Sequence, residues 1–448
     1  MAADRRNHSL PRVGALSLAI GLLFSAGAKA QSLQELYDAA RAYDATYLAA
    51  RAQADSVQYN VAQVDALGRP SLGVQVNSTQ NQIYPPSGQG PSYGYLQTQA
   101  GLNGKYALYN RGNSISIDQA QRNLGVAQAD MENAEQDLIV RVAQAYFDVL
   151  GARDTLSTNK ANRKAIAEQL ASAKRNFEVG TATITDTREA QARFDLATAQ
   201  ELAAENDLRV KQVTLDQIVG RVGVDPKPLA QPVALPALPS QQVETWVSQS
   251  AEHPSIRKAR LGLEVAQLET AKARAAENVT VDVNASLGGQ DLRGANVELI
   301  GPPGITKQAT IGLTVNYPLY TGGATQNRIK ETLKLEDKAH NDLDFAQRSV
   351  TEGTRRAFFG VQSLYAQVKA YEAAESSTKL ALEATELGYK VGVRVNLDVL
   401  NAQTQLYTTQ RDLAQARYDV LLNGLKLRQA SGQLRPEDIS AINTLLAK

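Results

Sequence analysis

Cysteine is absent from this sequence of 448 residues, and histidine occurs only three times, as His8, His253 and His340. Without cysteine, the chain has no disulfide framework, no thiolate metal site and no cysteine nucleophile. It also has no cysteine to carry a lipid, so any membrane attachment would have to come from the folded chain. Three scattered histidines do not suggest an imidazole-based metal or acid–base cluster. We therefore predict no cofactor and no metal site.

Charge of one sign is not in excess, since 47 Lys and Arg residues stand against 46 Asp and Glu residues. A nucleic-acid-binding protein needs a basic surface to meet phosphates, so this balance argues against that class. Paired carboxylates in a recognisable hydrolase motif are also missing, because the acidic residues fall mostly on the faces of expected helices. We predict that the protein is not an enzyme.

Long apolar runs are missing beyond the first thirty residues. There, a basic start precedes an apolar run over Val13–Gly27, and Ala28-Lys29-Ala30 forms a small-x-small cleavage site. This pattern predicts a signal peptide over residues 1–30 and a mature chain that begins near Gln31. The alternative, a transmembrane anchor, fits less well because the run is shorter than the roughly 20 residues that span a bilayer.

Proline is missing from two long stretches, Ser92–Asp225 and Leu319–Arg435, although the chain has fifteen prolines. Because proline is excluded from helix interiors, these stretches are where long helices can form. Five prolines lie within Asp225–Ser240. This cluster predicts an extended linker over residues 221–242.

The sequence on either side of the linker repeats at a constant offset of 212 (392 minus 180). We therefore expect two tandem copies of one unit, over residues 31–220 and 243–434, followed by a short C-terminal segment over 435–448. We expect this segment and the linker to lie at the equator of the molecule. Matched positions are Ala145-Tyr146-Phe147 with Ala357-Phe358-Phe359, Val179-Gly180 with Val391-Gly392, Asp186 with Asp398, and Gly220 with Gly432.

Heptad-like spacing predicts long, closely packed helices. Leu124, Ala127, Met131, Ala134 and Leu138 step by three and four residues, and small residues in such a seam let helices approach closely. One helix over about 113–176 would be on the order of 95 Å long. Helices over about 186–219 and 243–278 would be near half that length, so two of them end to end would match one long helix. An ordinary antiparallel bundle is the alternative that the helices alone leave open.

Strict alternation of apolar and polar residues predicts four β-strands, at about 70–82, 94–108, 279–289 and 308–319. Val279–Leu287 and Ile311–Tyr317 are the clearest examples. One apolar face and one face of small polar residues, over about ten residues, is typical of transmembrane barrel strands. Tyrosines flank these segments as an interfacial girdle would require; they are Tyr84, Tyr93, Tyr95, Tyr106, Tyr109, Tyr317 and Tyr320.

Four strands are too few to close a barrel, and open strand edges are not tolerated in lipid. Two chains would give eight strands, whose interior fills with side chains, whereas three chains would give twelve strands around a lumen. The predicted fold is therefore an α+β membrane protein. Its three chains form a twelve-stranded outer-membrane β-barrel, continuous with a long periplasmic α-helical barrel.

Two motifs that end the long helices, Phe177–Asp186 and Tyr389–Leu400, resemble those of the TolC family of outer-membrane efflux and secretion channels. Ala416–Asn423 and Pro318–Gly323 add to the resemblance, which covers essentially the whole mature chain. The resemblance implies a homotrimer in the outer membrane of a Gram-negative bacterium, closed at its periplasmic end by inward-coiling helices. Its partners would be a periplasmic adaptor protein and an inner-membrane ABC, RND or MFS transporter.

The resemblance also suggests roles for individual residues. The turns at Val179-Gly180 and Val391-Gly392 would contact the adaptor, although these glycines would equally serve as helix caps. Asp398 would face the pore as one acid of a threefold ring, and Asn401 stands where the family has a second acid. The alternative for Asp398 is a solvated acid at a helix start.

A closed-state latch would comprise Asp186, Arg394 and Tyr389, assisted by Thr185, with Arg394 paired to Asp186. Asp186 has a competing role in a helix capping box, for which Glu189 is the expected partner.

The sequence thus predicts an exit duct for small toxic compounds or unfolded protein, and leaves the cargo, the adaptor and the pump open. The alternative is a soluble periplasmic helical scaffold or coiled-coil adaptor, which would need no barrel strands.

Overall fold

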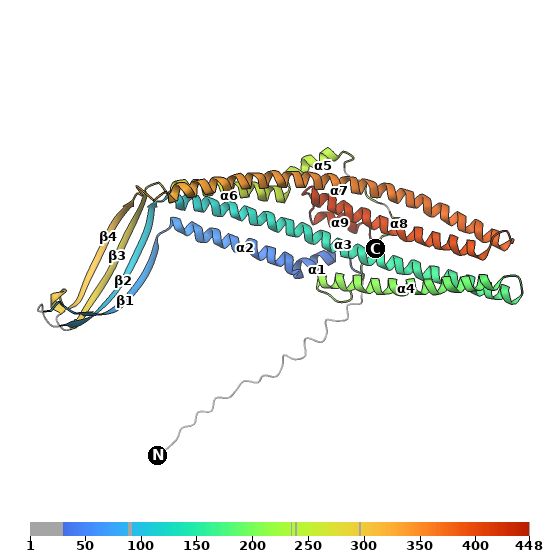
Figure 1. The fold of residues 1–448 in the computed structure, drawn as a ribbon, viewed down its shortest axis with the longest axis horizontal. Helices are drawn as coiled ribbons and strands as arrows, with labels where there is room; N and C mark the ends of the chain where they lie inside the picture. Colours follow the sequence, from blue (N-terminus) through green and yellow to red (C-terminus); the bar gives the residue numbers. More distant parts are fainter. Residues whose placement is uncertain (1–29, 88–91, 234, 238–239, 295–296, 448) are drawn as a thin grey trace, which may run out of the picture.

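The computed structural model describes residues 30–87, 92–233, 235–237, 240–294 and 297–447. The predicted leader, residues 1–30, lies outside the described residues except for Ala30. The described chain is elongated, with a sheet at one end and long helices that run away from it (Figure 1). The C-terminus lies about midway along the helical part (Figure 1).

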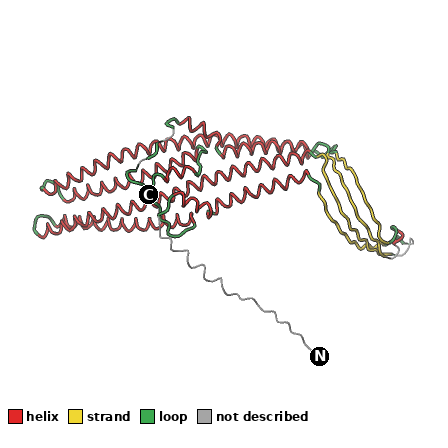
Figure 2. Tube along the Cα trace, turned by 180° about the vertical axis from the view of Figure 1, so that it is seen from behind, coloured by secondary structure: helices red, strands yellow, loops and turns green. Residues whose placement is uncertain are grey.

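One antiparallel sheet contains the four strands of the described chain in the order β1-β2-β3-β4. These strands are β1 (Ser71–Ile83), β2 (Tyr93–Tyr109), β3 (Thr280–Gly294) and β4 (Gly304–Asn316). The pairing of β2 with β3 joins the two tandem halves in the middle of the sheet, and leaves β1 and β4 as its edges (Figure 1). Figure 2 shows the same sheet from behind. The second hairpin extends beyond the predicted strand ends at its turn, and β4 ends before Pro318, which has no N–H to donate to a sheet.

Two long helices carry the chain away from the sheet, and two shorter ones return. They are α3 (Arg111–Glu178) with α4 (Ile184–Val219) in the first half, and α7 (Ala324–Lys390) with α8 (Asn396–Ala430) in the second. The 68 residues of α3 make it about 100 Å long. Each half therefore ends in a helical hairpin at the end of the molecule opposite the sheet (Figure 1).

Short helices complete the two halves. The first half opens with α1 (Leu33–Tyr43), α2 (Ala45–Asp65) and the 3-10 turn η1 (Ala66–Gly68). The second opens with α5 (Val243–Gln249), the turn η2 (Ser250–Glu252) and α6 (Pro254–Ala275), while η3 (Val297–Leu299) lies before β4 and α9 (Glu437–Asn443) near the C-terminus. None of the helices in the described part of the chain has the length and apolar character needed to cross a membrane.

The single helix predicted over Val243–Asn278 is wrong. The chain bends at His253, and a new helix begins with Pro254 at its first position, where the missing N–H of proline costs nothing. The His253 imidazole accepts a hydrogen bond from the Ser255 backbone N–H (Nδ1 to N, 3.0 Å) and thereby caps α6.

The helices form a row whose membership changes at mid-height. Near the sheet the row runs α2, α3, α6, α7, and near the far end it runs α4, α3, α8, α7. The long helices α3 and α7 therefore belong to both levels. At the two edges of the row stand α7 on one side and α2 followed by α4 on the other.

The largest core lies at mid-height, where α1, α3, α4, α8 and α9 meet. Its fully buried members include Leu36, Tyr146, Leu150 and Leu215. The Pro-rich linker crosses this core, because the Tyr146 hydroxyl donates to the Lys227 carbonyl (2.7 Å) and Arg153 pairs with Asp225 in the linker. Toward the far end the core narrows to small residues such as Ala173, Ala190 and Ala197, which let helices pack closely.

The predicted fold class is confirmed at the level of one chain, with four barrel-like strands, long helices and a tandem repeat. Periodicity identified these elements because alternation and proline exclusion are local consequences of backbone geometry.

Candidate functional site

The sheet has one apolar and one polar face. The strand register places apolar residues of neighbouring strands opposite one another. Val74 pairs with Leu102, which in turn pairs with Leu287. The apolar face is exposed in the single chain at Leu72, Val74, Val76, Leu287, Ile311, Leu313 and Val315. A contiguous apolar strip of this kind is typical of a surface that meets lipid or protein.

Amide side chains form hydrogen-bonded ladders across the opposite face. Gln99 donates to Gln290 (Nε2 to Oε1, 3.2 Å), and Asn103 donates to Gln75 (Nδ2 to Oε1, 3.4 Å). A hollow on this face is lined by Gln75, Asn77, Gln99, Asn103, Gln290 and Gln308. This face is therefore polar and uncharged over its middle part, as a water-filled passage requires.

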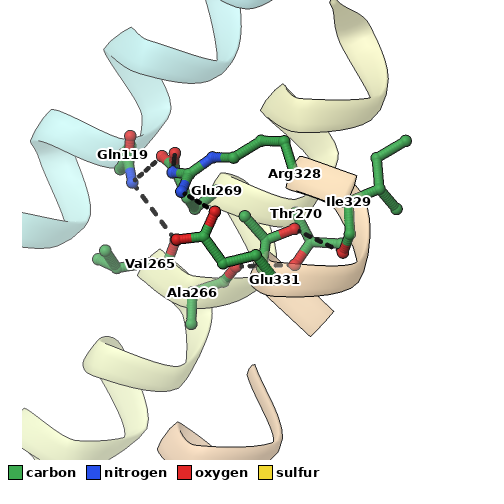
Figure 3. A network of polar contacts seen from close by, with 9 residues as sticks. Gln119, Val265, Ala266, Glu269, Thr270, Arg328, Ile329 and Glu331 are labelled. Atoms are coloured by element: carbon green, nitrogen blue, oxygen red, sulfur yellow. Dashed lines mark hydrogen bonds and ion pairs between the residues drawn. The ribbon is translucent and has the colours of Figure 1, made fainter. Parts of the chain in front are cut away.

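A polar network ties the helices together below the sheet. Glu269 of α6 accepts hydrogen bonds from Arg328 of α7 (Nη2 to Oε1, 2.6 Å) and from Gln119 of α3 (Nε2 to Oε2, 3.1 Å), as Figure 3 shows. Arg328 also pairs with Glu331 (2.9 Å). Burial opposes ionisation of Glu269, yet the bonds from Arg328 and Gln119 hold its pKa below the usual value. The network thus joins both halves of the repeat.

A second polar contact lies in the mid-height core. The Tyr418 hydroxyl of α8 donates to the Asp154 carboxylate of α3 (2.6 Å), and the Tyr418 ring stacks on Phe147. Burial raises the pKa of Asp154, while the hydrogen bond from Tyr418 opposes that rise. Both groups lie between helices of different halves, so the contact fixes the position of α8 against α3.

The two turns at the far end have the same backbone structure. The Gly180 N–H donates to the Phe177 carbonyl (3.0 Å) and the Thr181 N–H to the Asn176 carbonyl (2.8 Å), which is a Schellman cap. Gly180 has φ 76° and Gly392 has φ 82°, a left-handed conformation that favours glycine. The glycines therefore cap α3 and α7, which is one of the two roles expected from the sequence.

Apolar side chains surround these caps and point into solvent in the single chain. Val179 is 73% exposed and Val391 is 66% exposed. The other exposed apolar residues of the two turns and helix ends are Phe177, Ile184, Leu387, Val393 and Val395. Apolar residues gathered at an exposed turn favour a contact surface. Contact of Val179, Gly180, Val391 and Gly392 with an adaptor stays a prediction.

Asp186 is engaged at the start of its own helix. Its Oδ2 accepts hydrogen bonds from the Thr183 backbone N–H (2.9 Å) and hydroxyl (2.8 Å), while the Asp186 N–H donates back to the Thr183 hydroxyl (3.2 Å). This is a reciprocal capping box whose partner is Thr183 rather than Glu189. Thr185, which the sequence places beside the latch, is exposed in the same turn.

Arg394 pairs with Asp398 in this chain (Nη1 to Oδ2, 3.8 Å). Asp398 also accepts a hydrogen bond from the Val395 backbone N–H at the start of α8 (3.3 Å). An ion pair between Arg394 and Asp186 is not formed within the described part of the single chain, so the predicted pairing stays a prediction. About a third of the Asp398 side chain (37%) is exposed.

Two hydrogen bonds near the far end join the hairpins, and neither was predicted. Asn176 of α3 donates to the Tyr389 hydroxyl of α7 (3.1 Å), and Arg193 of α4 donates to Asn401 of α8 (Nη2 to Oδ1, 3.1 Å). Tyr389 and Asn401 were candidate site residues, whereas their partners Asn176 and Arg193 carry no motif. The structure therefore brings each candidate into contact with a residue of the other half.

Comparison with known proteins places these features in a family. The model of the family described as "outer membrane efflux protein" matches residues 36–221 and 247–433, which correspond to the two tandem halves. Outer membrane protein TolC of Vibrio cholerae is 33% identical over 437 residues, which cover 96% of each chain. Alkaline protease secretion protein AprF of Pseudomonas aeruginosa is 31% identical over 326 residues, or 71% of this chain and 67% of AprF.

Among solved structures, the outer membrane protein VceC of Vibrio cholerae has the same fold, with a TM-score of 0.75 at 20% identity. The match covers 89% of this chain and 96% of VceC. The soluble scaffold that the sequence left as an alternative is thus not supported. The chain belongs to the outer membrane efflux protein family and is an outer-membrane exit duct of the kind that serves efflux and type I secretion.

Proposed function

We propose that three copies of the chain close a twelve-stranded barrel in the outer membrane, above a tunnel of helices in the periplasm. The observation that best supports this proposal is the structure of the sheet, which exposes an apolar face and leaves β1 and β4 as unpaired edges. Lipid does not tolerate unpaired edges, so β4 of one copy would pair with β1 of the next. The edge helices of the row would meet in the same way, α7 against α2 and α4 of the neighbour.

Cysteine cross-linking tests this arrangement cleanly because the chain contains no cysteine. Asn77→Cys on β1 would be combined in turn with Thr310→Cys, Gly312→Cys and Thr314→Cys on β4, all on the polar face. Oxidation should give covalent trimers for at least one pair, and the single variants serve as controls. Trapping of dimers alone, with a mass of two chains in detergent, would contradict the trimer.

The end of the helices opposite the sheet, formed by Phe177–Asp186 and Tyr389–Leu400, is called the tip. It would bind a periplasmic adaptor, through which an inner-membrane ABC, RND or MFS transporter would deliver small toxic compounds or unfolded protein. The exposed Val179 and Val391 support this role, since binding an apolar partner would remove them from water. The combination Val179→Asp with Val391→Asp should abolish export while the trimer persists. Val222→Asp, the same change at a fully exposed valine outside the tip, is the matched control. Equal loss of export in both variants would argue against tip docking.

Within the tunnel, Asp398 would line the narrow end as a ring of three carboxylates, which attracts cations. Tyr389, Arg394 and Asp186 would hold the hairpins inward at rest. The duct would perform no catalysis, and export energy would come from the inner-membrane transporter.

A further inference from the structure

Arg193 is held in an unexpected position near the end of the helices that lies opposite the sheet. Glu189 precedes it by four residues on α4, an arrangement that commonly gives an ion pair on a helix surface. Among the described residues, however, Arg193 forms no ion pair with Glu189 or any other carboxylate. Its guanidinium donates instead to Asn401 of the opposite hairpin (Nη2 to Oδ1, 3.1 Å).

Asn401 fixes the height of this charge relative to Asp398. The two residues are three positions apart on α8, so they lie on the same helix face and about 4.5 Å apart along its axis. A guanidinium bound to Asn401 therefore lies within roughly 10 Å of the Asp398 carboxylate. Arg394 also pairs with Asp398 in this chain (Nη1 to Oδ2, 3.8 Å), so Arg193 is a second positive charge at this level.

We infer that Arg193 is a specificity-determining residue of the duct, which Asn401 positions as a ring of three positive charges next to the Asp398 ring. The inference rests on the proposed pore position of Asp398. An acid at position 401 would neutralise Arg193 by a charge-assisted bond. The neutral Asn401 amide anchors the guanidinium and leaves its charge in place, so the duct discriminates less strongly for cations than an acidic ring alone would.

The distance between the Arg193 charge and a permeating ion sets the size of the effect on ion selectivity. A unit charge about 8 Å from a monovalent ion in water changes the ion's local occupancy by roughly two- to threefold. Salt with a Debye length of about 10 Å at 0.1 M reduces this effect, so it should grow as the salt is diluted. A purely structural contact would not show such a dependence.

The test measures the cation-to-anion permeability ratio of the purified trimer in planar bilayers under a KCl gradient. Arg193→Gln should raise the ratio at least about twofold, with a larger change at low salt. Arg193→Lys keeps the charge and should leave the ratio near the wild-type value. Arg209→Gln, the same change on α4 at an exposed arginine paired with Glu205, is the matched control for net charge and should have no effect.

Asn401→Asp provides a second route that keeps Arg193, and it should also raise the ratio. An unchanged ratio in both Arg193→Gln and Asn401→Asp, with intact trimers, would overturn the inference. Asp398→Asn separates this failure from failure of the proposed pore: if Asp398→Asn lowers cation preference while the other two variants do nothing, the acidic ring stands and only the role of Arg193 is lost.

Discussion

Replacing Tyr389 by phenylalanine should raise the resting conductance of the reconstituted channel. The change removes only the hydroxyl that accepts the Asn176 amide (3.1 Å), and so it cuts one of the two hydrogen bonds that join the hairpins near the tip. The aromatic ring stays, so packing at the end of α7 should persist. The hairpins would then be freer to move apart.

The expected magnitude follows from the chemistry of the contact. A neutral hydrogen bond contributes about 0.5–1.5 kcal/mol net, so three symmetric copies would contribute about 1.5–4.5 kcal/mol to the closed state. A change of 1.4 kcal/mol is a factor of ten in an equilibrium constant, so the open fraction should rise by about tenfold or more. Adding Arg394→Ser should raise conductance further, because that residue was predicted to hold the same closed state.

Double-mutant cycles distinguish two partners for Tyr389. If Tyr389 acts through Asn176, then Asn176→Ala should open the channel to a similar degree and add little to Tyr389→Phe. The sequence-based latch instead expects Asp186→Ala to open the channel and to add little to the combination of Tyr389→Phe with Arg394→Ser. In the structure Asp186 is the N3 acid of a capping box with the N-cap Thr183, so its loss should lower the local stability of α4 independently of Tyr389.

Single-channel recording in planar bilayers measures the effect, and trimer recovery in detergent checks assembly. Tyr407→Phe is the control, because Tyr407 lies on α8 of the same hairpin and makes no hydrogen bond to the other hairpin among the described contacts. Resting conductance in Tyr389→Phe and Asn176→Ala equal to wild type, with intact trimers, would refute the reasoning.

Three further outcomes are expected. N-terminal sequencing of protein from outer membranes should place the mature start at or near Gln31, whose backbone N–H and side-chain oxygen both bond Asp225; retention of residues 1–30 would contradict this. Asp398→Asn should weaken block of the channel by a trivalent cation, measured as a higher blocking concentration, because the ring loses three charges. Hydrogen bonds from Arg141 hold the pKa of Asp44 below its usual value, although burial alone would raise that pKa. Because the folded-state pKa is below the unfolded one, the stabilisation of the fold by ionised Asp44 is complete above about pH 4 and is lost as the pH falls through the folded-state pKa. Asp44→Asn should therefore lower the thermal unfolding temperature of the protein at pH 7 and make that temperature less dependent on pH between 5 and 3, whereas unchanged pH dependence would exclude Asp44 as its source.

The strands and long helices could be predicted because their signals are local. Alternation along Val279–Leu287 follows from the strand period of two, and the proline-free stretches follow from the missing N–H of proline. The break at Pro254 could have been predicted by the same rule, because Pro254 lies in the interior of the helix predicted over 243–278, where proline is excluded, and proline is common at the first position of a new helix.

Contacts at the tip could not be predicted in the same way. Asn176 and Tyr389 lie 213 positions apart, and Arg193 and Asn401 lie 208 apart, so no local pattern relates them. The capping partner of Asp186 was available in the sequence, since Thr183 three residues earlier matches the capping-box pattern more closely than Glu189 three residues later. The partner lies on the N-terminal side of Asp186, because Thr183 is the N-cap and Asp186 the N3 residue of α4.

Comparison of the two repeats distinguishes residues at the tip that are the same in both copies from residues that differ. Gly180 and Gly392 occupy equivalent positions and form the same cap, and Asp186 and Asp398 are equivalent acids that each accept a backbone N–H at a helix start. These shared positions stabilise each hairpin by itself.

The bonds between hairpins instead use positions at which the two copies differ. At an offset of 212, Tyr389 corresponds to Phe177 and Asn176 to Gly388, and neither counterpart can repeat the bond between them. Arg193 corresponds to Gln405, and Asn401 to Glu189, so the donor and the acceptor of this bond also differ between the two copies. A perfectly repeated unit would place identical side chains on both hairpins, so a donor specific to one hairpin and an acceptor specific to the other require divergence. Residues that regulate the narrow end should therefore be sought where the halves differ, which also explains why the repeat that identified the fold could not identify Asn176 or Arg193.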